Sequence, residues 1–136
     1  MSKLTAFLLA NTVDNLVEEV VVSDRFRDEE GNLLKFKIKA LTPDEFAELQ
    51  KECTTYGKKG KVSFNNQMFN ERLIVKNTLD PAFNDADFLK KAGCITPEQA
   101  INKMLLAGEV AELASAITKA SGFDTDLDEL KTEAKN

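Results

Sequence analysis

The sequence predicts an α+β fold, in which an N-terminal antiparallel β-hairpin packs on a mainly α-helical body of five or six helices. A run of β-branched and aromatic residues at positions 17–27 is followed by a turn and by the alternating segment 34–40. After position 42, apolar residues recur at helical spacing. With 136 residues, 43% of them hydrophobic, residues 1–136 have the size and composition of one domain.

A short helix is expected over residues 3–10, because Leu4, Phe7 and Leu8 recur at i, i+3 and i+4 and so share one face. A helix of this length is unstable on its own. It must therefore dock on the core of this chain or serve as an arm that docks on a partner, and both options stay open.

The hairpin comes next along the chain. Residues 17–27 are the strongest strand signal, and residues 28–32 form a turn in which Gly31 suits a positive φ. Phe36 and Ile38 then alternate with lysines, which gives one buried and one solvated face. Because an isolated hairpin is marginally stable in water, helices must cover its apolar face.

Two helix starts carry a capping-box pattern, with Thr at the N-cap followed by Pro: one begins at Thr42, the other at Thr96. The first helix should run to about residue 54 with Cys53 facing inward. The second should break near Gly108.

Further helices are expected over about 66–79, 85–92 and from Leu106 to a close at Gly122. The helix at 66–79 is apolar most of the way round and should be central. In the helix after Leu106, Glu109, Glu112 and Lys119 are expected outside. A last amphipathic helix would carry Phe123, Leu127 and Leu130, and residues 56–65 are expected to form a flexible basic loop.

Enzymatic and metal chemistry find no support in the sequence. There is no His, which removes imidazole bases and ligands. The acidic run 124–128 lacks the Gly and Glu that an EF-hand loop requires, and Gly57 to Lys61 lack phosphate-loop spacing. We therefore expect neither an enzyme, a cofactor nor a metal site.

Several classes of partner are also excluded. A chain of net charge −5 with three Arg is a poor nucleic-acid binder. No stretch approaches the ~20 apolar residues of a membrane span, and two unpaired cysteines fit a reducing compartment. We therefore expect a soluble cytosolic protein that binds other proteins.

The candidate protein-binding residues are the apolar positions at the two ends, which suit helix-in-groove contacts. They are Leu4, Phe7, Leu8, Phe123, Leu127 and Leu130. Lys58, Lys59 and Lys61 form a basic loop, which is either solvated or a contact for an acidic partner.

Five segments in order resemble the XkdN-like phage tail assembly chaperones of Gram-positive bacteriophages and prophages. They are AFLL (6–9), VVVSDRFRDEEGN (20–32), FKIKALTPDEF (36–46), KMLLAGE (103–109) and SGFD (121–124). The resemblance runs nearly end to end and rests on the order and spacing of the segments.

The resemblance implies a non-enzymatic protein of the host bacterial cytoplasm that is absent from the mature virion. Such chaperones bind the tape-measure protein while tail-tube subunits assemble around it. Many also occur in a frameshifted, longer form that recruits the tube subunit, and Ala134-Lys135-Asn136 could mark such a site. Self-association is left open. The main alternative is a tail-completion or connector protein that stays in the virion.

Overall fold

The structure, a computed structural model, describes residues 1–13, 16–123 and 134. Its elements lie in the order α1 (Lys3–Ala10), β1 (Val17–Val20), β2 (Phe36–Lys39), α2 (Pro43–Glu52), β3 (Thr54–Tyr56), the 3₁₀ turn η2 (Lys58–Gly60), β4 (Val62–Phe64), α3 (Asn66–Asn77), β5 (Thr78–Asp80), α4 (Ala86–Ala92), α5 (Pro97–Met104) and α6 (Ala107–Ala120). The expected α+β class is confirmed.

The predicted N-terminal hairpin is present and belongs to a three-stranded sheet of order β1-β2-β5. Strands β1 and β2 are antiparallel, with Val17 opposite Lys39 and Val20 opposite Phe36. The turn at 28–32 also forms, and Gly31 has φ +89°. Strand β5 pairs antiparallel with the other edge of β2, so that β2 is the central strand.

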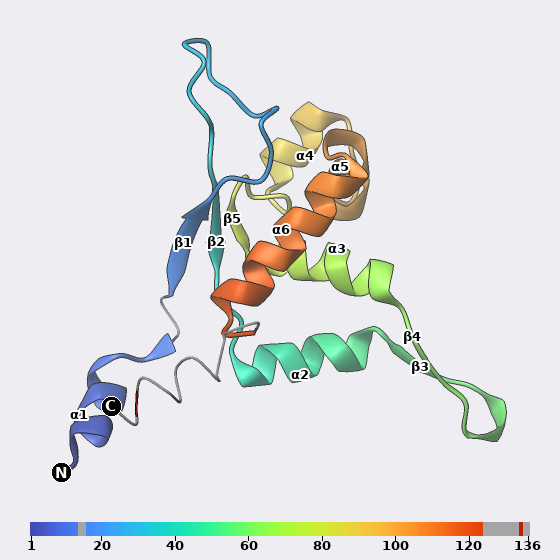
Figure 1. The fold of residues 1–136 in the computed structure, drawn as a ribbon. Helices are drawn as coiled ribbons and strands as arrows, with labels where there is room; N and C mark the ends of the chain where they lie inside the picture. Colours follow the sequence, from blue (N-terminus) through green and yellow to red (C-terminus); the bar gives the residue numbers. More distant parts are fainter. Residues whose placement is uncertain (14–15, 124–133, 135–136) are drawn as a thin grey trace.

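Helices α3, α4, α5 and α6 lie on one side of this sheet, as Figure 1 shows, and α3 is central to the helices of the body. It contacts α2, α5 and α6, while α6 also contacts β2. The core between sheet and helices contains Ile38 from β2, Leu73 and Ile74 from α3, and Leu113 and Ile117 from α6, each at most 1% exposed. Removal of these apolar side chains from water is the main favourable contribution to the stability of the fold.

Three expected boundaries differ from those in the structure. The strand expected over 17–27 ends at Val20, since the chain leaves the ladder and rejoins it only at an Arg27–Leu33 bridge. The helix expected to residue 79 ends at Asn77, because Thr78 and Asp80 pair with β2. The break expected near Gly108 falls earlier, where Leu105 and Leu106 are extended, and Gly108 lies inside α6.

The flexible basic loop expected over 56–65 is also wrong, because this part of the chain forms a second hairpin. Strands β3 and β4 pair antiparallel, and the hairpin projects from the body beyond the ends of α2 and α3 (Figure 1). The end of the last expected helix, with Leu127 and Leu130, lies outside the described residues.

Candidate protein-binding surfaces

Helix α1 presents a largely exposed apolar surface. Ser2 caps the helix, its Oγ accepting a hydrogen bond from the Thr5 amide at 3.0 Å. The side chains of Leu4, Phe7, Leu8 and Leu9 are 67, 60, 58 and 70% exposed, and α1 has no buried residue. Since an eight-residue helix is marginal in water, this exposure fits a segment that acts by contacting another surface.

Further exposed apolar side chains follow α1 in the sequence. Val13, Leu16, Val17 and Val21 are each about half exposed, at 48, 52, 47 and 44%. The connection is anchored where the Ala40 amide donates to the Leu16 carbonyl at 3.0 Å. Leu16 is therefore hydrogen-bonded next to the edge strand β1, while α1 itself lies apart from the body (Figure 1).

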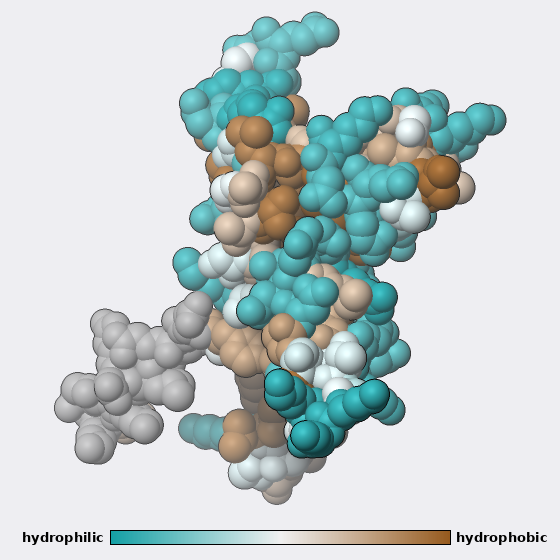
Figure 2. Space-filling view, turned by 90° about the vertical axis from the view of Figure 1, so that its right-hand side faces the viewer, coloured by the Kyte–Doolittle hydropathy of each residue, from teal (hydrophilic) through white to brown (hydrophobic). Residues whose placement is uncertain are grey.

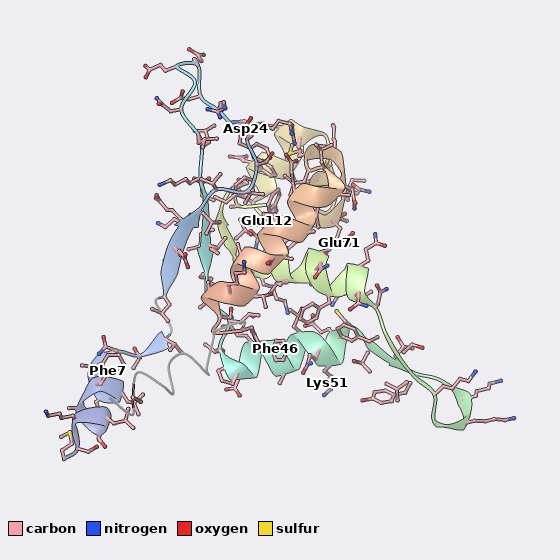
Figure 3. All side chains as sticks on the ribbon, viewed as in Figure 1. Phe7, Asp24, Phe46, Lys51, Glu71 and Glu112 are labelled. Atoms are coloured by element: carbon pink, nitrogen blue, oxygen red, sulfur yellow. The ribbon has the colours of Figure 1, made fainter. Side chains whose placement is uncertain are left out.

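Phe123 occupies a different place from α1. Gly122, at φ +95°, ends α6, and the Phe123 amide donates back to the Thr118 carbonyl at 3.2 Å. The Phe123 ring is 43% exposed and lies 5.2 Å from that of Phe46 on α2. Figure 3 shows Phe7 on α1 well away from Phe46, so the structure does not bring the described apolar positions of the two ends together.

Phe123 begins a row of four phenylalanines across the α2–α3 side of the body. Ring centroids are 5.2 Å apart for Phe123 and Phe46, 6.0 Å for Phe46 and Phe69, and 5.4 Å for Phe69 and Phe64. These rings line an open groove of about 340 Å³. We call it the aromatic groove. The sequence pattern did not identify it, because its residues come from four separate segments.

The three lysines of the basic loop lie at the tip of the β3–β4 hairpin and are all exposed. The tip closes through a hydrogen bond from the Gly57 amide to the Lys61 carbonyl at 2.7 Å. Lys59 and Gly60 both have positive φ, +64° and +75°. The β-favouring residues on both sides of the Gly-Lys-rich run were the available signal for this hairpin.

Arg25 and Glu109 form the most buried ion pair among the described residues. Arg25 donates to both Glu109 carboxylate oxygens, Nε at 3.0 Å and a terminal nitrogen at 2.6 Å, and also to the Met104 carbonyl. Glu109 was expected outside and is instead 4% exposed. The Arg25 hydrogen bonds, with help from the Leu106 amide and against the effect of burial, lower the pKa of Glu109 to about 2.

The remaining polar contacts are structural as well. Glu52 on α2 binds Arg72 and Lys76 of α3 at 2.9 and 3.0 Å, which lowers the pKa of this carboxyl. Burial raises the pKa of the Cys53 thiol, which faces inward as expected, and a raised pKa disfavours the reactive thiolate. Within residues 1–13, 16–123 and 134, no cluster of potential metal ligands occurs.

The described helices include none that is long and apolar enough to cross a membrane.

Comparison with known proteins decides the family. Residues 4–135 match the family described as phage XkdN-like tail assembly chaperone protein. The chain belongs to the XkdN-like tail assembly chaperone family.

Two relatives of this chain come from Bacillus subtilis strain 168. The uncharacterised protein YqbN is 33% identical and the phage-like element PBSX protein XkdN is 30% identical, both over 138 positions that cover 98% of this chain and 93% of the relative. The crystal structure of YqbN matches with a TM-score of 0.70 at 31% identity, covering 91% of this chain and 99% of that one. This chain and YqbN therefore share one fold over nearly the whole chain.

Proposed function

We propose that this chain is a non-enzymatic chaperone that holds the tape-measure protein of its phage or prophage in the host cytoplasm until tube subunits assemble around it. The observation that carries the proposal is α1, whose four apolar side chains are each more than half exposed. Membership of the tail assembly chaperone family supports the same function.

The proposed mechanism is capture of an apolar helical segment of the client by α1. Leu4, Phe7 and Leu8 present anchors at i, i+3 and i+4, the spacing by which an amphipathic helix binds a hydrophobic surface. Burying each such side chain contributes about 1.5–3 kcal/mol. The net charge of −5 helps to keep the complex soluble. The client leaves when tube subunits cover the same apolar surface.

A longer form made by frameshifting near Ala134-Lys135-Asn136 would add contacts to the tube subunit. The coding DNA tests this part of the proposal directly. A slippery run of A at these codons is expected, and other codons for the same residues would remove this site.

Co-expression with the tape-measure protein of the same genome tests client capture. The wild-type chain should keep the client soluble and co-purify with it. The double variant Phe7→Ser/Leu8→Ser should reduce the co-purified client by at least about tenfold, because it removes two anchors. The control Ile95→Ser removes an apolar side chain of the body that is even more exposed, at 86%, and should leave capture unchanged.

A client that stays insoluble with the wild-type chain would contradict the proposal. Mass spectrometry of purified virions separates it from the alternative, since a tail-completion or connector protein would be found in the particle and a chaperone would not.

A further inference from the structure

The β3–β4 hairpin has one apolar face and one polar face. Its register places Thr54 opposite Phe64, Thr55 opposite Ser63 and Tyr56 opposite Val62. Because side chains alternate along a strand and directly opposed residues share a face, Tyr56, Val62 and Phe64 lie together. They are 76, 62 and 43% exposed. The polar side chains of Thr55 and Ser63 lie on the other face.

The apolar face of the hairpin continues the aromatic groove. Phe64 is the last ring of the phenylalanine row and packs against Phe69 at 5.4 Å. The base of the hairpin is fixed to the body, since the Asn65 amide donates to the Cys53 carbonyl at 2.9 Å. Tyr56 and Val62, farther out, project on the same face as Phe64. Groove and hairpin therefore form one apolar surface that runs from Phe123 to the hairpin tip.

This surface is basic at its outer end and uncharged along the groove. Lys58, Lys59 and Lys61 are exposed at the tip. The polar residues that line the groove are amides and a hydroxyl, namely Gln50, Asn66, Asn70 and Thr118. Figure 2 views the side from which the hairpin projects and shows hydrophilic atoms at the front next to hydrophobic surface. In a chain of net charge −5, this local excess of cations favours an acidic partner.

We infer that the aromatic groove and the apolar hairpin face together bind an acidic amphipathic helix of a partner protein. The ring-to-ring separations of 5.2 to 6.0 Å are close to the ~5.4 Å pitch of an α-helix, so that side chains one turn apart can lie against successive rings. Carboxylates on the flank of that helix face the three lysines. This site is separate from α1, and the inference does not depend on client capture there.

Fluorescence anisotropy with designed peptides tests the inference on the full chain. The probe is a fluorescein-labelled peptide of about 15 residues with Leu at one-turn spacing and Glu at the other positions, and its control carries Lys in place of Glu. We expect saturable binding of the Glu peptide, weakened by added salt because the charges are exposed. The Lys peptide should bind at least about tenfold more weakly.

Variants of the hairpin locate the binding site. Lys58→Glu/Lys59→Glu/Lys61→Glu should weaken the Glu peptide by at least about tenfold, and Tyr56→Ser/Val62→Ser should weaken both peptides. The control Lys90→Glu/Lys91→Glu alters exposed lysines of α4 and should have no effect beyond that of net charge. Circular dichroism of each variant should match the wild type, since every altered side chain is exposed.

Three results would overturn the inference. They are no saturable binding of the Glu peptide to the full chain, equal binding of both peptides, and binding that the hairpin variants leave unchanged. Concentration-dependent self-association that the Tyr56→Ser/Val62→Ser variant abolishes would also overturn it, because a second copy would then occupy the surface. None of these results affects the α1 experiment, so the two proposals fail separately.

Discussion

Arg25 and Glu109 join parts of the chain that are 84 positions apart in the sequence. Arg25 follows the point where the first hairpin leaves the sheet ladder, and Glu109 lies in the first turn of α6, where its carboxylate also accepts from the Leu106 amide at 2.8 Å. The Arg25 guanidinium lies 4.7 Å from the Phe26 ring centre as well. The Glu109 side chain thus caps α6 and, through Arg25, also fixes the loop that follows β1 onto this helix.

Replacing this carboxylate should make the protein less stable in a pH-dependent way. Glu109→Gln loses the charge that Arg25 binds and should lower the free energy of unfolding at pH 7 by about 2 kcal/mol. The pKa of Glu109 is lowered from its ordinary 4.5 to about 2, so its contribution is complete above pH 4.5 and is lost as pH falls toward 2. Urea unfolding of both proteins should therefore show a difference that shrinks between pH 5 and pH 2.

Glu112→Gln is the control for this experiment. Glu112 is an exposed carboxylate on the same helix, so its replacement should change stability by less than about 0.5 kcal/mol. A Glu109→Gln protein as stable as the wild type at pH 7 would show that the ion pair only compensates for its own desolvation.

Helices α1 and α6 contain similar apolar residues, which are exposed in α1 and buried in the core in α6. Leu113 of α6 is 0% exposed and packs in the core, whereas Leu8 of α1 is 58% exposed. The local sequences of both helices are rich in apolar residues. Only the tertiary packing of the chain therefore distinguishes the buried helix from the exposed one. The same substitution at both positions therefore distinguishes a core helix from a docking helix.

Leu113→Ala should destabilise the protein by about 2–5 kcal/mol, because it leaves a cavity in the core. Leu8→Ala should change stability by less than about 0.5 kcal/mol, because that side chain is 58% exposed. Chemical denaturation followed by circular dichroism measures both. A large loss of stability for Leu8→Ala would place α1 in the folded core and contradict its assignment as a docking arm.

Elements with local signals could be predicted from the sequence. Both expected Thr-Pro capping boxes form, with Thr42 accepting from the Glu45 amide and Thr96 from the Gln99 amide. Such helix starts depend on neighbours within one turn, so the sequence specifies them directly. The alternation of Phe36 and Ile38 likewise predicted β2 correctly.

Elements that depend on distant partners could not be predicted in this way. Strand β5 has three residues, and it is a strand only because β2 lies beside it. The β3–β4 strands are equally short and flank a run rich in Gly and Lys, which resembles a loop. The burial of Glu109 and the aromatic groove also arise from tertiary packing. The apolar positions of α1 were predicted as candidates, and their docking stays a prediction.

Two of the exposed apolar surfaces in the described part of the chain lie apart from each other. Helix α1 and its connection to β1 form one, and the hairpin face with the aromatic groove forms the other (Figure 1). The two proposed binding sites therefore lie on different surfaces.

The two surfaces should act independently because they share no residues. Combining Phe7→Ser/Leu8→Ser with Lys58→Glu/Lys59→Glu/Lys61→Glu should reduce client capture only as much as the α1 change alone does. The same protein should lose peptide binding only as much as the hairpin change alone causes. Free energies of binding for distant sites add within about 0.5 kcal/mol. A larger deviation in either assay would show that the surfaces are coupled.

The place of β5 in the sheet has a consequence for how the protein forms during translation. The first hairpin can close as soon as β2 leaves the ribosome, but the other edge of β2 stays open until α2, β3, β4 and α3 have also been made. An open strand edge readily pairs with other chains. Fragments released before Thr78 is made would therefore be prone to aggregate through this edge, whereas chains that extend past Asp80 cover it.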